Sequence, residues 1–390
     1  MSVKLTPCNS LPTHVSAENA RTWGTVGCFA LAAALEFSSP VIRQNHLCYL
    51  TFACGSKLGA RDFPGASTIV TLEDIQQAHA RLNGITVHTP AIDVTAEIAD
   101  PGDTRRLFLK LENLQPIGAF KLRGAYNKIA SLTPEERKRG VIAYSSGNHA
   151  QGVAYAARAL NTKAVIVMPG NAPPIKLKAT AGMGAEIVKV GAGSQERQLK
   201  AEELAVQHGY AIVPPYNDEK IIAGQGTMGL EILEQVPAVE TVLVPGGGGG
   251  MISGVAAAIK LSRPSVKVVG VEPALAADAQ ASFRSGKVVN LAAEEVTRTM
   301  ADGLRTQSIG AINFEHIRKF VDDIVTVSEE EIREATRRLS MNPRTVAEPS
   351  GAVSVAGFLF HGKELPAATV HVAVISGGNI EPAMLAEVRR

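Results

Sequence analysis

Three short apolar runs of this sequence are each followed by residues that could bind a polar ligand. Ser145, Ser146, Gly147, Asn148 and His149 follow the first run, five glycines follow the second, and Ser376, two glycines and Asn379 follow the third. Hydroxyl, amide and imidazole groups can hold and protonate polar substrates, and glycine lets the backbone approach an anion closely. In open α/β sheets, ligands bind beyond the carboxyl ends of the strands. If the apolar runs are such strands, the three segments form one site.

The five glycines, Gly246–Gly250, are referred to below as the glycine loop. They lie between Pro245, which ends an apolar run, and a helical stretch that begins near Met251. Consecutive amides at a helix N-terminus form a cradle for an anion, so we expect the loop to bind a phosphate group. No Lys-Ser or Lys-Thr pair follows, and no GxGxxG motif with a suitably spaced acidic residue is present, which excludes nucleoside-triphosphate and nicotinamide motifs. The alternative is a flexible loop.

The elements that must position these segments alternate along the chain from about residue 70. Thr71 with Asp74, and Ser328 with Glu331, form capping-box patterns that predict the starts of two helices. Short β-branched runs predict strands, and the stretches between them have helical spacing. The predicted strands are Val141–Ser145, Ala164–Met168, Thr241–Pro245, Val266–Val271 and Val370–Ser376, and the predicted helices include His149–Leu160, Gln195–His208 and Met251–Leu261. This alternation predicts an α/β fold with largely parallel sheets.

The composition is that of an ordinary globular protein. Of the 390 residues, 45% are hydrophobic and 19% are charged, and the net charge is +2. Without a basic run or a large net charge, we expect neither nucleic acid nor a membrane as a partner. All four cysteines lie in the first 54 residues, at spacings that fit no zinc or CxxC motif. A remainder without cysteine is compatible with a reducing compartment, and we expect a cytoplasmic protein.

Residues 1–68 are expected to form a poorly ordered N-terminal extension. The run Thr25–Leu35 is apolar and follows Arg21, but it is shorter than the roughly 20 residues that cross a bilayer. A secretory signal is the alternative interpretation of this run.

The segment Glu112–Ala125, ENLQPIGAFKLRGA, resembles the Schiff-base segment of fold-type-II pyridoxal-5′-phosphate (PLP) enzymes, close to the serine racemase and threonine dehydratase group. In that family a lysine that follows phenylalanine binds the cofactor covalently, and Phe120 and Lys121 occupy these positions. The resemblance extends from about Thr71 to the C-terminus. It implies a tryptophan synthase β-like fold with two open, twisted, largely parallel sheets flanked by helices. It also implies an active site between a large domain, 69–139 plus 218–390, and a small domain, 140–217.

The resemblance implies roles for the three segments. Asn148 would hydrogen-bond the 3-oxygen of the cofactor, and Ser145, Asn148 and His149 would bind the substrate carboxylate. Ser376 would contact the pyridine nitrogen of the cofactor. A hydroxyl at this position polarises the ring only weakly, so the ring is a moderate electron sink, which favours elimination. The phosphate would lie on five consecutive residues: Gly247, Gly248, Gly249, Gly250 and Met251. The alternatives are a buried structural histidine at position 149 and an ordinary turn serine at 376.

A further resemblance concerns Glu272–Asp278, which is similar to the divalent-cation segment of racemase-like members. It implies that the carboxylates of Glu272 and Asp278 and the carbonyl of Ala276 bind Mg²⁺ or Mn²⁺, which prefer such hard oxygen ligands. The metal would have a structural role. The alternative is a solvated acidic loop after a strand.

The function implied by the resemblance is that of an ammonia-lyase converting L-threonine or L-serine to 2-oxobutanoate or pyruvate. Lys121 would remove the α-proton, because burial lowers the pKa of a lysine. Ser146, where many dehydratases carry alanine, could supply the second acid/base that a serine racemase needs. Serine racemase and threo-3-hydroxyaspartate ammonia-lyase are therefore alternatives. The resemblance further implies a homodimer or homotetramer acting on a small hydroxy-amino acid.

Two rival classes are weaker. Cysteine-synthase-like enzymes carry threonine where His149 stands, and a non-catalytic amino-acid sensor would not need the lysine, the asparagine and the glycine loop together. The chain also departs from its relatives at four positions, which leaves the preferred substrate open: Ile117, Ala119, Tyr216 and Gly246.

Overall fold

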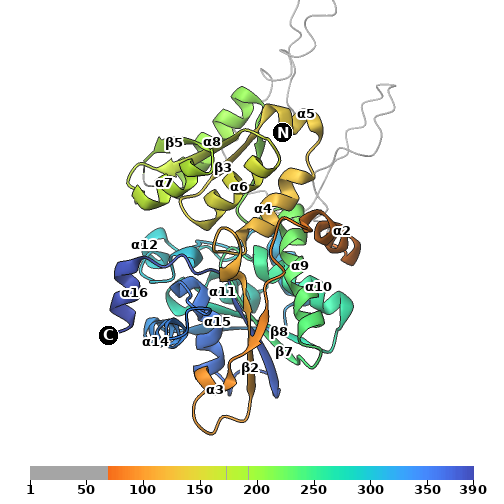
Figure 1. Ribbon diagram of the computed structural model, residues 1–390, viewed down its shortest axis with the longest axis vertical. Helices are drawn as coiled ribbons and strands as arrows, with labels where there is room; N and C mark the ends of the chain where they lie inside the picture. Colours follow the sequence, from red (N-terminus) through yellow and green to blue (C-terminus); the bar gives the residue numbers. More distant parts are fainter. Residues whose placement is uncertain (1–68, 173, 192) are drawn as a thin grey trace, which may run out of the picture. The chain divides into compact units, whose positions relative to one another are not determined.

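The computed structural model describes residues 69–172, 174–191 and 193–390, which belong to one compact unit (Figure 1). The predicted N-terminal extension, residues 1–68, lies outside the described residues, as do the run Thr25–Leu35 and all four cysteines. The division into a large and a small domain at residues 140 and 217 stays a prediction.

The larger sheet has six strands in the order β1-β2-β10-β7-β8-β9. Neighbouring strands are parallel except β1 and β2, which are antiparallel. Successive side chains of a strand point to opposite faces, so Val372 and Val374 join one core cluster while Ala373 and Ile375 join another. The strands are β1 (Ala91–Asp93), β2 (Arg106–Leu111), β7 (Thr241–Pro245), β8 (Lys267–Pro273), β9 (Asp323–Val327) and β10 (Val370–Ile375).

The smaller sheet has four parallel strands in the order β5-β4-β3-β6. Its central strand β4 is buried along its whole length and reads as a continuous apolar run, as expected for a parallel strand covered on both faces. The strands are β3 (Val141–Tyr144), β4 (Ala164–Pro169), β5 (Glu186–Val190) and β6 (Ala211–Ile212).

Helices cover both faces of the six-stranded sheet. Helix α15 (Pro349–Phe360) packs on one face, and α10 (Gly250–Ser262) packs on the other together with α9 (Glu219–Gln235). Helices α6 (Asn148–Ala159) and α8 (Ser194–His208) pack against the four-stranded sheet, and α6 also contacts α4 (Lys121–Ala130). The other helices are α2 (Leu72–Leu82), α3 (Thr95–Ile98), η1 (Glu112–Leu114), α5 (Pro134–Arg139), α7 (Pro174–Gly182), η2 (Ala274–Ala276), α11 (Asp278–Ser285), α12 (Ala293–Val296), η3 (Asp302–Leu304), α13 (Ala311–Phe320), α14 (Glu329–Ser340) and α16 (Pro382–Val388).

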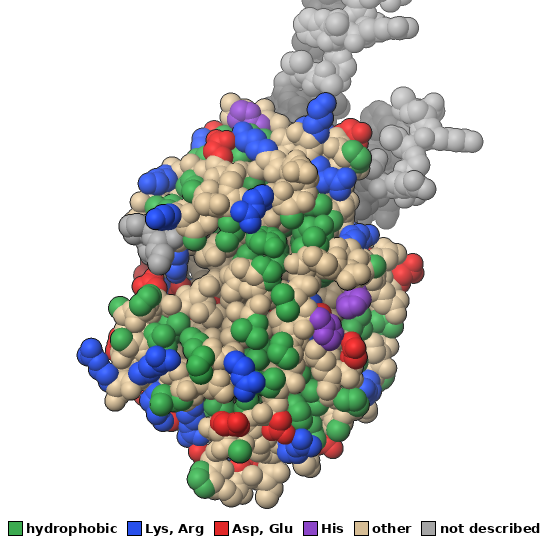
Figure 2. All heavy atoms as spheres, viewed as in Figure 1, with side chains coloured by type: hydrophobic (Ala, Val, Ile, Leu, Met, Phe, Trp, Pro, Cys, Tyr) green, Lys and Arg blue, Asp and Glu red, His purple; other side chains and the backbone are tan. Residues whose placement is uncertain are grey.

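The α/β fold with two largely parallel sheets is confirmed, and so are the five predicted strands, each within two residues of its bounds. Both capping boxes are present at the starts of α2 and α14. None of the helices in the described ranges combines the length and the hydropathy that a bilayer crossing requires. Figure 2 shows Lys and Arg side chains scattered over one face among acidic and neutral side chains.

Candidate active site

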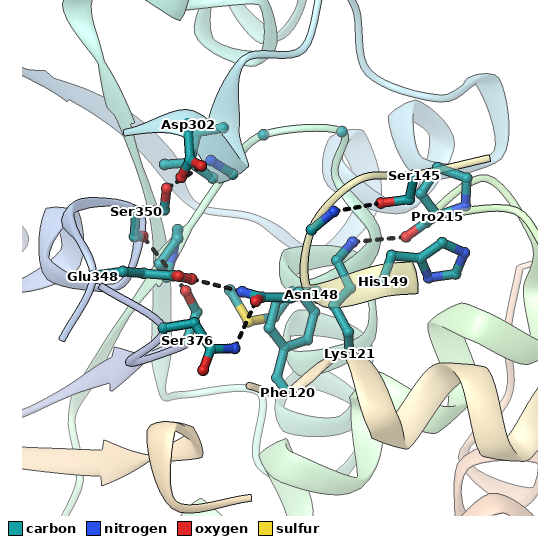
Figure 3. A pocket seen from close by; sticks show the side chains of 18 of the residues that line it. Phe120, Lys121, Ser145, Asn148, His149, Pro215, Asp302, Glu348, Ser350 and Ser376 are labelled. Carbon is teal, nitrogen blue, oxygen red and sulfur yellow. Dashed lines mark hydrogen bonds between the residues drawn. The ribbon is translucent and has the colours of Figure 1, made fainter. Parts of the chain in front are cut away.

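A pocket of about 420 Å³ lies where elements of both sheets meet. It is lined by the residues that follow β3, β7 and β10 and by the first residues of α4, α6 and α10 (Figure 3). The three segments singled out in the sequence therefore line the same pocket. The predicted cofactor, catalytic and substrate residues that line it are Phe120, Lys121, Ser145, Ser146, Asn148, His149, Gly247–Gly250, Met251 and Ser376.

Lys121 is the first residue of α4, and its half-buried side chain lines this pocket. Its ammonium Nζ donates a hydrogen bond to the Pro215 carbonyl oxygen at 2.8 Å and lies 5.1 Å from the centre of the Phe120 ring. Burial lowers the pKa of Lys121 from 10.5 to about 8. About a tenth of the amine is therefore neutral at pH 7, far more than for a solvated lysine, and a neutral amine can attack a carbonyl or accept a proton.

The backbone places this lysine beside the end of β10. The Phe120 amide donates to the Ser376 carbonyl at 3.0 Å, and Ala119 pairs with Gly377 in an isolated bridge. The side-chain oxygen of Ser376 lies 3.4 Å from the Ser350 carbonyl oxygen, at the limit of a hydrogen bond. This weakly held hydroxyl is 5% exposed and lines the pocket, so it is available to a ligand atom.

The glycine loop connects β7 to α10. Gly247 and Gly249 have φ angles of 59° and 90°, which non-glycine residues rarely adopt. A Cβ atom on Gly250 would lie 2.8 Å from the Tyr216 Cβ, and one on Gly248 would overlap the Tyr216 ring. The departure at Tyr216 thus places a ring against the loop. The loop and the start of α10 line the pocket, and the first amides of a helix have no partner within it.

Asn148, the first residue of α6, is held by two neighbours. Its amide nitrogen donates to the Glu348 carboxylate at 2.7 Å, and its amide oxygen accepts from the Asn379 side chain at 2.8 Å (Figure 3). Burial, reinforced by the charge of Asp302, raises the pKa of Glu348 to about 7. The second hydrogen on the Asn148 nitrogen is left for a ligand in the pocket.

Glu348 was missed by the sequence analysis. It is 7% exposed, immediately precedes α15 and lines the pocket. The sequence does contain a signal for it. Glu348 is followed by Pro349, a serine and a glycine at the start of a long apolar helix, and the other polar segments of the site also stand at helix starts.

One ring nitrogen of His149 makes a structural hydrogen bond. Its Nε2 donates to the Val213 carbonyl oxygen at 2.9 Å, and this tautomer follows because a carbonyl can only accept. Burial and the nearby charge of Lys121 lower the pKa of His149 to about 3, so the ring is neutral. The side chain still lines the pocket, and its predicted contact with the substrate carboxylate stays a prediction.

Ser145 and Ser146 also line the pocket. The Ser145 hydroxyl oxygen accepts a hydrogen bond from the Gly147 amide at 3.3 Å, which shapes the turn into α6. No described residue hydrogen-bonds the Ser146 side chain, which leaves it available to a ligand. Its role as a second acid/base stays a prediction.

The pocket fits pyridoxal phosphate. The Lys121 amine can bind the aldehyde covalently. The glycine loop, whose close neighbours leave no space for side chains, can hold the phosphate with its backbone amides. The Ser376 hydroxyl and the Asn148 amide can contact the ring. The carboxyl ends of the strands supply these groups from segments far apart in the sequence.

The predicted metal residues lie outside the pocket, behind the glycine loop. Glu272 and Asp278 are fully buried, and the Glu272 Oε1 and Asp278 Oδ2 atoms have no hydrogen-bond partner. Burial raises the pKa of Asp278 to about 7, and burial together with the charge of Asp278 raises the pKa of Glu272. The alternative of a solvated acidic loop is therefore wrong. Among the described residues no three or more His, Cys, Asp or Glu side chains form a metal-binding group, so a cation here would need backbone oxygens such as that of Ala276.

The chain is similar to known proteins over most of its length. Residues 86–377 match the family described as pyridoxal-phosphate dependent enzyme. It is 45% identical over 318 residues to an L-threonine ammonia-lyase of Thermotoga maritima, covering 81% of this chain and 77% of that protein. It is 41% identical over 313 residues to an L-threo-3-hydroxyaspartate ammonia-lyase of Saccharomyces cerevisiae, covering 80% and 94%.

Solved structures agree with these matches. A threonine deaminase from T.th. has a TM-score of 0.74 and 41% identity, covering 80% of this chain and 99% of that structure. A maize serine racemase has a TM-score of 0.77 and 34% identity, covering 82% and 97%.

Proposed function

This chain belongs to the family of pyridoxal-phosphate-dependent enzymes, and from that premise we propose that it is an ammonia-lyase for L-threonine and L-serine. The reaction would remove the α-proton and the β-hydroxyl of the substrate, and the released enamine would hydrolyse to a 2-oxo acid and ammonia. Threonine would give 2-oxobutanoate and serine would give pyruvate. The observation that supports this most directly is the placement of Lys121, the glycine loop and Ser376 around one pocket.

The chain's own residues suit this elimination. When bound, the cofactor supplies an electron sink for the negative charge that develops at the α-carbon. Lys121, with a pKa of about 8, can accept the α-proton without a large energetic cost. The first residues of α6 line the pocket, and the first amides of a helix have no partner within it, so they can hold the substrate carboxylate. Ser376 offers a neutral hydroxyl rather than a carboxylate to the ring nitrogen, which favours elimination.

The test is ammonia and 2-oxo acid release from L-threonine, L-serine and L-threo-3-hydroxyaspartate. Wild type should release both products, and Lys121→Ala should release neither and lose the visible absorbance of the bound cofactor. Lys138→Ala, on the surface helix α5, is the matched control and should behave as wild type. Turnover by Lys121→Ala would refute the assignment.

Serine racemase activity is proposed as a side activity, because the Ser146 hydroxyl lines the pocket and has no side-chain partner among the described residues. Ser146→Ala should lower D-serine formation from L-serine more than it lowers pyruvate formation. Equal loss of both products would remove the argument for racemisation.

We also propose a divalent cation, Mg²⁺ or Mn²⁺, at Glu272, Asp278 and the Ala276 carbonyl. The two unpartnered buried carboxylate oxygens support it, because burying such oxygens costs free energy without a hydrogen bond or a cation.

The assembly that we propose is a homodimer or homotetramer, which light scattering would measure. The compartment that we propose is the cytoplasm, which cell fractionation would test.

A further inference from the structure

The pocket contains a second lysine. Lys121 and Lys176 are the lysine or arginine side chains among the described residues that line it. Lys176 belongs to α7, which packs against α6 and β5, and its Nζ lies 3.1 Å from the Asp302 Oδ2 atom. Asp302 begins η3, which packs against α15 on the six-stranded sheet. The ion pair therefore joins elements of the two sheets across the pocket.

The pair lies close to the Asn148 contact. The charge of Asp302 raises the pKa of Glu348 and the charge of Lys176 lowers it, so both act on the carboxylate that holds Asn148. Figure 3 shows Asp302, Ser350 and Glu348 on the same side of the pocket. Lys176 is thus a cation at the edge of the pocket, and its charge is already paired with that of Asp302.

A substrate with two carboxylates meets a specific difficulty here. Its α-carboxylate can take the amides at the start of α6. Lys121 is reserved for the cofactor, so Lys176 is the remaining cationic partner for the second carboxylate among the described Lys and Arg side chains that line the pocket. Binding there would displace Asp302 and leave an aspartate beside Glu348 without a cation. Because the side chains of Lys176 and Asp302 are 25% and 47% exposed, water screens the pair and the cost in free energy is modest. A threonine or serine side chain adds no charge and leaves the ion pair intact.

We propose that the Lys176–Asp302 ion pair determines specificity by favouring hydroxy-amino acids with uncharged side chains over 3-hydroxyaspartate. The inference rests on the proposed ammonia-lyase function and deepens it. The aspartate acts as the discriminating group, and the lysine would become a carboxylate-binding group once the aspartate is neutralised.

The experiment compares kcat/KM for L-threonine and L-threo-3-hydroxyaspartate in the holoenzyme and its variants. Asp302→Asn keeps the side-chain shape and should shift the ratio about fivefold toward hydroxyaspartate, the size expected for a partly exposed ion pair. Lys176→Gln should shift the ratio the other way, because Asp302 is then unpaired. The double variant Lys176→Gln/Asp302→Asn should lose the gain made by Asp302→Asn.

A second readout needs no turnover. L-aspartate lacks the leaving hydroxyl, so its affinity can be titrated through the absorbance of the bound cofactor, with L-alanine as the uncharged comparison. Asp302→Asn should increase the affinity for L-aspartate relative to L-alanine.

The outcomes separate this inference from the proposed function. An unchanged ratio in Asp302→Asn, a gain that persists in the double variant, or a wild type that prefers hydroxyaspartate would overturn the inference and leave the lyase function intact. A wild-type holoenzyme that releases no ammonia from any of these substrates would overturn the proposed function.

Discussion

Lys121 illustrates how one residue acquires reactivity from its surroundings. A solvated lysine is almost fully protonated at neutral pH, whereas this side chain is largely removed from water, donates to a single carbonyl oxygen and has a pKa of about 8. No carboxylate pairs with it among the described residues, so the charged form has little compensation for its lost hydration. The lysine is thus prepared for proton transfer by burial alone.

The first prediction concerns covalent capture of pyridoxal phosphate by the apoprotein. Only the neutral amine attacks the aldehyde, so the rate of capture should rise with pH, with a midpoint at about 8, and then level off. Stopped-flow absorbance across the pH range would measure it, with Lys121→Arg as the non-reacting control. A midpoint near 10.5, the ordinary value for lysine, would show that burial does not act on this amine.

Glu348 provides a second prediction because its pKa of about 7 lies above the ordinary value of 4.5. Between these values the folded state binds a proton that the unfolded state has lost, so this group's contribution to stability should fall as pH rises through that window. Glu348→Gln cannot titrate and should lose this pH dependence. Urea unfolding of the apoprotein from pH 4.5 to 7.5 would measure the difference between the two proteins, with exposed Glu135→Gln as the control. Parallel curves for wild type and Glu348→Gln would contradict the raised pKa.

At the scale of elements, the glycine loop depends on its contact with Tyr216. A Cβ atom on Gly248 would overlap the Tyr216 ring, so Gly248→Ala must move either the ring or the loop. Such overpacking typically costs about 1–3 kcal/mol, and the displaced amides would hold the phosphate less well. We expect the dissociation constant of pyridoxal phosphate to rise at least about tenfold, as measured by absorbance titration.

The matched control is Gly182→Ala at the end of α7, where an added Cβ meets no atom within 4 Å. It should leave cofactor affinity unchanged. If both variants bind the cofactor as wild type does, the shape of the glycine loop is not what holds the phosphate.

The connection from β8 through η2 to α11 carries the metal prediction. A free pair of buried carboxylates becomes costly as pH rises through about 7, because Asp278 then loses its proton beside Glu272. A bound cation would remove that cost, so Mn²⁺ or Mg²⁺ should raise the melting temperature more at pH 8 than at pH 6. Calorimetry should show no such gain for Asp278→Asn, whereas exposed Asp100→Asn should keep it. Equal gains in all three proteins would place the cation elsewhere.

At the scale of the whole molecule, the sequence predicted β3, β4, β7, β8 and β10 well because each is a short apolar run rich in β-branched residues. It did not predict α9, since glycines at 224, 226 and 229 lower helix propensity. In the structure these glycines permit close packing: a Cβ on Gly224 would lie 2.7 Å from the Arg123 carbonyl oxygen, and one on Gly226 would lie 3.0 Å from that of Gly254. The strands β1, β2, β5, β6 and β9 were missed. In β2, β5 and β9 charged or polar residues interrupt the apolar run, and β1 and β6 are too short to show a pattern.

The pocket residues were predictable where a local motif marks them, as at Lys121 and the glycine loop. Contacts between distant segments were not. The bond between His149 and the Val213 carbonyl and the bond between Asn148 and Glu348 join residues 64 and 200 positions apart. No local pattern encodes such pairs, because the fold brings them together.

A buried ion cluster ties the six-stranded sheet to the helix that carries Lys121. The Arg123 guanidinium on α4 bonds Glu112 at 2.8 Å and Glu231 at 2.6 Å, and Lys110 on β2 bonds Glu231 at 2.6 Å. The four residues are at most 3% exposed. A buried charge that loses its partner is strongly destabilising, whereas an exposed pair contributes little.

We therefore expect Arg123→Met to lower the free energy of unfolding by about 3–5 kcal/mol, because two buried carboxylates lose their shared cation and Lys110 can compensate only one of them. Glu186→Gln, which breaks the exposed pair with Lys163 on the edge of the other sheet, should cost at most about 1 kcal/mol. Urea unfolding of both holoenzymes measures the two values. Arg123 lies two residues after Lys121 on the same helix, so its loss should also disturb the lysine. The folded fraction of Arg123→Met should therefore show altered absorbance of the bound cofactor. A loss of stability in Arg123→Met no larger than in Glu186→Gln would mean that packing, and not the ion cluster, holds α4 against the sheet.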